Sequence, residues 1–207
     1  MNILLFGATG RTGSHLLRLA GETPHTYTVF VRSTHKLPSP LPANVRIVQG
    51  DARSIQDVRS AVSGKDGVIS CLSTDKQNLL QAFTPILKEA MTEFGITRVV
   101  TIGTAGILQS RAEPHLFRFE SSESRRKTTT AAEDHLAAFK ILRASKLDWT
   151  IVCPTYLPEG TASGRIRAEA EVLPEGGSRI TTGDTAAFVF REFFNSAFLY
   201  KRVGIAE

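Results

Sequence analysis

Hydrophobic residues occur along the chain in short runs, and segments long enough for a helix separate these runs. Runs such as Val29-Phe30-Val31 and Val68-Ile69 are continuously apolar, which is typical of parallel strands covered by helices on both faces. The alternation predicts right-handed crossovers and a doubly wound, mostly parallel α/β sheet of the Rossmann type. We expect strands at residues 2–6, 27–32, 45–49, 67–72, 98–102 and 149–153, and helices at residues 12–20, 54–62, 77–94 and 130–145.

The length of 207 residues predicts a single domain that spans residues 1–207. Two segments interrupt the alternation, a polar one near 105–129 and a glycine-rich one near 154–182. Both follow late strands, so both are expected at the carboxyl edge of the sheet, where open α/β folds bind ligands. Long loops at that edge favour a role in covering a substrate.

The turn after the first expected strand carries the run Gly7-Ala8-Thr9-Gly10-Arg11-Thr12-Gly13. Gly7 permits a tight turn, Gly10 lets the backbone approach a pyrophosphate, and Gly13 lets the helix pack against the strand. The helix N-terminus favours phosphate, and the hydroxyls of Thr9 and Thr12 lie in the same run. The strand, turn and helix context predicts a dinucleotide site, and the alternative is a turn with only a structural role.

The end of the second expected strand selects the cofactor. NAD sites usually present an acidic residue there to hold the ribose 2′-hydroxyl, but this strand ends in Arg32 and Ser33, with Lys36 close behind. These groups suit a 2′-phosphate, and Arg11 in the glycine turn is a further candidate for it. Although an arginine at a strand end is often only solvated, the pattern favours NADPH over NADH.

Asp51 follows the third expected strand, with Ala52 beside it. The Asp51 carboxylate suits the adenine amino group, and Ala52 is expected to contact the same end of the cofactor. A helix-capping role for Asp51, just before Ser54, is an equal alternative.

Residues 7–13, 32–37, 50–51, 133–136, 140–145 and 147–154 together resemble the atypical short-chain dehydrogenase/reductases. Within these, the chain is most similar to the NAD(P)H-binding biliverdin reductase B and flavin reductase-like group, which is related to the NmrA-like proteins. The resemblance covers most of the chain and implies an oxidoreductase, with a serine in many members where Thr104 stands. It implies further cofactor contacts from Leu72, Ser73, Thr74, Gly103, Thr104, Ala105, Pro154, Thr155 and Tyr156.

The usual catalytic pair of short-chain dehydrogenases is a tyrosine with a lysine four residues further on, which lowers the phenol pKa. None of the three tyrosines has a lysine at that spacing, and Leu136 stands four residues before Lys140. Alcohol–ketone chemistry of the usual kind is therefore not expected. The pattern favours hydride transfer to a flat conjugated acceptor, such as a flavin, a quinone or a linear tetrapyrrole.

Several residues are candidates for work on that acceptor. Thr104 is expected beside the nicotinamide, with the proton coming from its hydroxyl or from solvent. Tyr156 is a candidate to stack the acceptor, with ordinary packing as the alternative. Phe117 and Phe119 either stack the acceptor or pack in the core. His135 either donates a proton or helps to cap its helix, and the capping role is favoured.

A non-catalytic alternative is a redox sensor that binds NADP(H) and acts through a protein partner, which the basic 111–127 segment allows. The formal charge of +5 also fits nucleic acid in principle, but the basic residues are scattered, so a polyanionic cofactor is the favoured explanation. The cluster Arg125-Arg126-Lys127 is interpreted as a solvated loop, with an anion contact as the alternative.

Cys71 and Cys153 each lie in an apolar run, which predicts packed, reduced thiols and neither a disulfide nor a metal site. Together with the absence of an 18-residue apolar run and of a signal-peptide pattern in residues 1–7, this predicts a cytoplasmic protein without membrane contact. The phenylalanines between 188 and 198 are expected in the core, with a partner surface as the alternative.

Overall fold

Eight strands form one sheet in the order β3-β2-β1-β4-β5-β6-β8-β7 in the computed structural model, which describes every residue except 76, 125 and 126. Neighbouring strands run parallel, apart from β7, which pairs antiparallel with β8. This confirms the expected doubly wound α/β class. The strands are β1 (Asn2–Phe6), β2 (Thr26–Val31), β3 (Val45–Gln49), β4 (Gly67–Ser70), β5 (Arg98–Ile102), β6 (Asp148–Pro154), β7 (Arg167–Ala170) and β8 (Lys201–Ala206).

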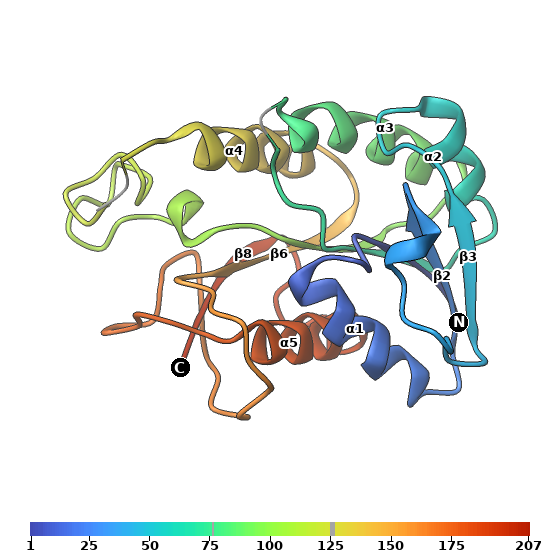
Figure 1. The fold of residues 1–207 in the computed structure, drawn as a ribbon. Helices are drawn as coiled ribbons and strands as arrows, with labels where there is room; N and C mark the ends of the chain where they lie inside the picture. Colours follow the sequence, from blue (N-terminus) through green and yellow to red (C-terminus); the bar gives the residue numbers. More distant parts are fainter. Residues whose placement is uncertain (76, 125–126) are drawn as a thin grey trace.

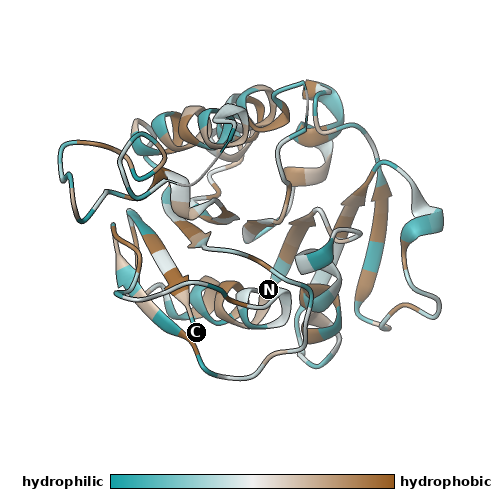
Figure 2. Cartoon of the chain, turned by 60° about the vertical axis from the view of Figure 1, so that its left-hand side comes forward, coloured by the Kyte–Doolittle hydropathy of each residue, from teal (hydrophilic) through white to brown (hydrophobic). Residues whose placement is uncertain are grey.

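Helices cover both faces of the sheet (Figure 1). One face carries α1 and α5, and the other carries α2, α3 and α4, so each face buries its own apolar cluster. The strands are mostly hydrophobic in colour and the connecting loops more hydrophilic (Figure 2). The helices are α1 (Arg11–Gly21), α2 (Ile55–Val62), α3 (Leu79–Glu93), α4 (Thr130–Arg143) and α5 (Thr182–Asn195), with short 3-10 turns η1 (Thr34–Lys36) and η2 (Ala105–Ile107).

The expected strands and helices are all present, and their bounds agree within two residues. Strands β7 and β8 are not among the expected elements, and β7 lies inside the segment 154–182, which is expected to be a loop. The Arg-Ala-Glu-Ala sequence of β7 has only two small alanines on its apolar face, and it becomes a strand through backbone pairing with β8. Phe188 and Phe193 on α5 are buried. Phe190 and Phe194 on the same helix, and Phe198 just after it, pack against the same cluster, which confirms the expected core.

The chain reverses its winding between β1 and β4, which lie side by side although β2 and β3 separate them in the sequence. Such a switch point opens a crevice at the carboxyl ends of the strands. The glycine turn after β1 and the loops after β2, β4, β5 and β6 therefore share one edge of the sheet. Among the helices of the described chain, none has the length and apolar character that a membrane crossing requires.

Candidate functional site

The glycine turn is held against the end of β4. The Cys71 N–H donates to the Phe6 carbonyl at 2.9 Å, and a Cβ at Gly7, whose φ is +78°, would lie 2.6 Å from the Cys71 carbonyl carbon. A Cβ at Gly13 would lie 2.0 Å from the Gly7 carbonyl oxygen. The close approaches expected from the motif are therefore present.

Helix α1 begins directly after this turn. Its N-cap, Gly10, supplies no side-chain acceptor, and its first turn contains no acidic residue. The N–H groups that open a helix need an acceptor, and here a phosphate fits that requirement. Thr9 and Gly10 are exposed at the turn, whereas Thr12 is buried in the first turn of the helix.

A pocket of about 100 Å³ lies beside the turn, between the ends of β2, β3 and β4. It brings together residues that are expected at the phosphates and residues that are expected at the adenosine end of the cofactor, and it adds several that the sequence motifs do not identify. The expected residues are Gly7, Thr9, Arg32, Asp51, Ala52 and Leu72, and the added ones are Phe30, Val31, Arg53 and Leu79.

The basic end of β2 lies at the mouth of this pocket. Arg32 and Lys36 are exposed, and the Ser33 hydroxyl is hydrogen-bonded to the His35 ring. The Gln49 side-chain amide donates to the Arg32 carbonyl at 3.2 Å, which ties the end of β2 to β3. These groups give the pocket mouth a positive character suited to a 2′-phosphate.

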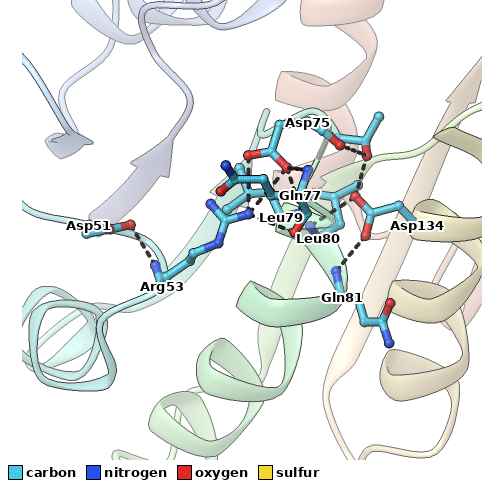
Figure 3. Close-up of polar contacts among 9 residues, drawn as sticks. Asp51, Arg53, Asp75, Gln77, Leu79, Leu80, Gln81 and Asp134 are labelled. Carbon is cyan, nitrogen blue, oxygen red and sulfur yellow. Dashed lines mark hydrogen bonds and ion pairs between the residues drawn. The ribbon is translucent and has the colours of Figure 1, made fainter. Parts of the chain in front are cut away.

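Asp51 does not cap helix α2. Its Oδ1 accepts the Arg53 N–H at 2.9 Å (Figure 3). Ser54 is the N-cap of α2, and its hydroxyl accepts the Asp57 N–H at 3.2 Å. The capping alternative for Asp51 is therefore wrong in this structure. Its exposed carboxylate lines the pocket, where the expected adenine contact stays a prediction.

Arg53 crosses from the loop after β3 to the loop after β4. Its Nη2 lies 3.2 Å from Asp75 Oδ2 and donates to the Gln77 carbonyl at 3.0 Å (Figure 3). Asp75 also accepts the backbone N–H groups of Gln77 and Leu79, at 2.8 and 3.1 Å. Partial burial acts to raise the Asp75 pKa, but these hydrogen bonds and the Arg53 charge hold the pKa below its ordinary value.

A second acid fixes the start of α3 from the neighbouring helix. Asp134, on α4 and 2% exposed, accepts the N–H groups of Leu80 at 3.2 Å and Gln81 at 2.8 Å, as well as the Thr74 hydroxyl (Figure 3). Asn78, the N-cap of α3, makes no side-chain capping bond. No local sequence signal indicates this cap, because Asp134 lies more than fifty residues from the start of α3.

Arg11 lies on the other side of the glycine turn. Its Nη1 donates to the Leu157 carbonyl at 3.1 Å, in the loop after β6. Strands β1, β4 and β5 separate β6 from β2 in the sheet, so this contact directs Arg11 away from Arg32. The 2′-phosphate contact expected of Arg11 would require the side chain to leave the Leu157 carbonyl.

The loops after β5 and β6 border a cavity of about 790 Å³. Thr104 precedes it as the cap of η2, and its Oγ1 accepts the Gly106 N–H at 3.4 Å. Tyr156 is 70% exposed in this cavity, while Pro154 is buried at the end of β6. The lining combines both expected covering segments: Ala105, Arg118, Ser122, Glu123, Thr155, Tyr156, Gly177 and Ser178.

The remaining catalytic candidates lie elsewhere. His135 is 8% exposed and lines a separate interior pocket of about 20 Å³ between α3 and α4, together with Gly103. Phe117 and Phe119 pack against the core, with the Phe117 ring 6.5 Å from that of Phe139. The packing alternative is therefore confirmed for both phenylalanines, and both roles considered for His135, helix capping and proton donation, stay predictions.

The thiols of Cys71 and Cys153 are free, and burial raises the Cys71 pKa to about 12. Among the described residues, no three His, Cys, Asp or Glu side chains gather as metal ligands would. Of the basic cluster expected at 125–127, Arg125 and Arg126 lie outside the described residues.

The glycine turn, the positive end of β2 and the crevice between them define a dinucleotide-binding Rossmann domain. The profile of the NAD(P)H-binding family matches residues 7–196, and the chain belongs to that family.

Solved structures share the whole fold. A Burkholderia pseudomallei protein described as exported is 26% identical, with a TM-score of 0.86 and coverage of 100% of both chains. A wide-type short-chain dehydrogenase/reductase from Veillonella parvula, in complex with NADP, is 17% identical, with a TM-score of 0.82 over 100% of this chain and 94% of that one. ChuY, an anaerobillin reductase from Escherichia coli O157:H7, is 22% identical, with a TM-score of 0.80 over 100% and 97%.

Proposed function

We propose that the protein is an NADPH-dependent oxidoreductase of the atypical short-chain dehydrogenase/reductase type, which transfers hydride to a flat conjugated acceptor. The observation that carries this proposal is the position of two hollows along one sheet edge. The pocket with Arg32 and Asp51 lies on the β2 side of the glycine turn, and the cavity with Tyr156 lies on the β6 side. A dinucleotide laid across the turn would join them.

The residues present fit NADPH. The N–H groups at the start of α1 would hold the pyrophosphate, and Arg32, Ser33 and Lys36 would hold the 2′-phosphate. The Veillonella parvula relative with bound NADP supports this choice. The loop with Leu72, Ser73 and Thr74 follows β4 at the same edge, where it would border the ribose and the diphosphate.

When bound, NADPH would supply a hydride to the acceptor and become NADP⁺. One proton added to the acceptor would then complete its two-electron reduction. Thr104 would hold its hydroxyl beside the reacting atoms, and the proton would come from that hydroxyl or from solvent. Thr155 and Tyr156 would close over the carboxamide, and the exposed Tyr156 ring would stack the acceptor.

The positions of the three tyrosines support the proposal that the acceptor needs little help from a protein proton donor. Tyr27 is buried, and burial raises its pKa, while the Tyr200 hydroxyl is hydrogen-bonded to Asp148, which also raises the Tyr200 pKa. Neither lines the cavity. Tyr156 does, but Gly160 stands where its lysine would be. The anaerobillin reductase with this fold supports the inclusion of tetrapyrroles among the acceptors.

The test is a titration of the purified protein with NADPH and NADH, followed by FMN, a quinone and a linear tetrapyrrole, with absorbance read at the nicotinamide band. We expect NADPH-preferring binding and acceptor-dependent oxidation. Tight binding without oxidation by any acceptor would favour the redox sensor with a protein partner. Failure to bind either nucleotide would contradict both.

The free thiols of Cys71 and Cys153 support a reducing compartment and hence a cytoplasmic location as part of this proposal. We propose a small molecule as the partner, with neither nucleic acid nor a membrane involved. Fractionation of cells that express the tagged chain tests the location, and recovery outside the cytoplasm would contradict it.

A further inference from the structure

Arg118 is a basic residue inside the cavity that borders Ala105 and Tyr156. Its Nε is buried, and no described residue accepts a hydrogen bond from it. Buried donors in folded proteins almost always have an acceptor, because an unmet one costs free energy. The position of the arginine therefore suits an acceptor that the described part of the chain does not supply.

Glu123 is the acid nearest to this guanidinium, and it does not fill that role. Its Oε1 lies 3.6 Å from Arg118 Nε, which is an ion pair beyond hydrogen-bond distance. Its Oε2 accepts the Ser110 hydroxyl and the Arg111 N–H, the latter at 2.9 Å. Burial acts to raise the Glu123 pKa, but these bonds and the Arg118 charge hold the pKa below its ordinary value. Glu123 is therefore an ionised anchor for the loop, and it leaves Arg118 Nε without a hydrogen-bond acceptor among the described residues.

The backbone holds Arg118 in a fixed relation to Thr104. The Arg118 N–H donates to the Leu108 carbonyl at 2.7 Å, and the next N–H, of Phe119, donates to the Gly106 carbonyl at 2.9 Å. Gly106 in turn donates its N–H to the Thr104 hydroxyl at 3.4 Å. An acceptor that reacts beside Thr104 would therefore lie close to the backbone segment that carries Arg118.

We propose that Arg118 binds a terminal anionic group, a phosphate or a carboxylate, on the acceptor. The inference rests on the proposed function and narrows it to flat conjugated acceptors that carry such an arm. A guanidinium matches both anions through paired N–H donors. The exposed Ser178 adds a hydroxyl to the same lining, and the cavity size suits a ligand of this class.

Two matched pairs of probes test the inference. FMN and riboflavin share one ring system and differ by a phosphate, and biliverdin and its dimethyl ester differ by two free carboxylates. Dissociation constants are measured by fluorescence quenching in the presence of NADP⁺, so that binding is read without turnover. We expect the charged member of at least one pair to bind about tenfold tighter or more. The pair that shows the preference identifies the anion.

Substitution of the arginine assigns the effect. Arg118→Gln is expected to remove the preference and leave the neutral probes unchanged, and Arg118→Lys is expected to keep part of it. Arg111→Gln is the matched control, because Arg111 lies in the same segment but pairs with Glu169 and does not line the cavity. Thermal unfolding of each variant shows that it is folded, and Arg118→Lys provides the comparison if the glutamine variant is not.

Equal binding of charged and neutral probes by the unsubstituted protein would overturn the inference. So would equal weakening of both members of a pair in Arg118→Gln, or binding of none of the four probes. Binding that prefers the anion, without NADPH oxidation by any acceptor, would instead support the role of Arg118 and contradict the proposed reductase.

Discussion

Asp134 on α4 accepts the hydroxyl hydrogen of Thr74, which lies in the loop after β4. The same carboxylate accepts the Leu80 and Gln81 N–H groups, so one buried acid fixes both the start of α3 and a loop of the cofactor edge. The stability of α3 and the shape of the cofactor site therefore depend on a shared group.

Asp134→Ala is expected to lower the free energy of unfolding by about 3 kcal/mol, because it leaves several buried donors without an acceptor. NADPH affinity is expected to fall as well, since Thr74 loses its anchor. Urea unfolding and cofactor titration measure the two effects. Glu133→Ala, which changes the exposed neighbouring acid, is the control. Equal stability of the two variants would contradict the capping role.

Arg32→Ala is expected to weaken NADPH binding by about tenfold or more and NADH binding much less, because only NADPH carries the 2′-phosphate. Isothermal titration with each nucleotide measures the ratio. Arg46→Ala removes the same charge from β3, outside the pocket lining, and should leave the ratio unchanged. An equal loss of affinity for both nucleotides in Arg32→Ala would mean that Arg32 does not bind the 2′-phosphate.

Gly13→Ala is expected to abolish NADPH binding and to destabilise the fold, because its Cβ would lie 2.0 Å from the Gly7 carbonyl oxygen. Overpacking of this kind costs about 1–3 kcal/mol or more. Ser14→Ala, one residue further on, loses only the hydrogen bond to the Arg11 carbonyl and serves as the control. Circular-dichroism melts and a binding titration give both readouts, and wild-type behaviour of Gly13→Ala would rule out the close packing.

Asp184 should make stability depend on pH. Burial acts to raise its pKa, but hydrogen bonds from the Ser163 and Gly164 N–H groups and from Thr181 hold the pKa below its ordinary value. A carboxyl group whose pKa is lower in the folded state than in the unfolded state stabilises the fold at pH values above its unfolded-state pKa, about 3.9. This contribution is lost as the pH falls through the folded-state pKa.

Asp184→Asn is therefore expected to be less stable than the wild type at pH 7, by about 2 kcal/mol. The difference should shrink once the pH falls below the ordinary carboxyl range. Urea unfolding across this range measures it, with Glu22→Gln, at an exposed acid, as the control. A difference that stays constant down to the acid limit would show that the charge of Asp184 is not involved.

Thr104→Ala tests the source of the proton. If the hydroxyl donates it, kcat should fall by about a hundredfold, while Thr104→Ser should stay near the wild type. The KM for NADPH, measured beside kcat, separates proton donation from loss of the η2 cap. Full turnover in Thr104→Ala would assign the proton to solvent.

Strands β1 to β6 could be predicted from the sequence, because the buried strands of the sheet are apolar and the spacing of the glycines after β1 has a direct steric reason. Strand β8 could not be predicted in this way, because the charged residue Arg202 occupies one of its buried positions and interrupts the apolar pattern. That charge is accommodated by Glu171 and by the Phe139 ring, 4.4 Å away, and neither is near it in the chain. Such compensation exists only after folding.

The cofactor end of the site was predictable for a similar reason, since its residues sit in short motifs at strand ends. Arg53 and Arg118 were not, because their roles depend on which loop each side chain reaches. Arg53 is defined by Asp75 in the next loop, and Arg118 by a cavity that two distant segments enclose. Neither relation has a fixed spacing.

The hydrogen bond from Arg11 to the Leu157 carbonyl carries a kinetic consequence. Leu157 directly follows Tyr156, so the Arg11 guanidinium connects the glycine turn to the loop that borders the acceptor cavity. A dinucleotide that draws the guanidinium toward its phosphates would free that carbonyl and alter the loop that the acceptor meets. The two reactants should therefore add in a compulsory order, with the nucleotide leading, and an oxidised nucleotide should compete with the reduced one and not with the acceptor.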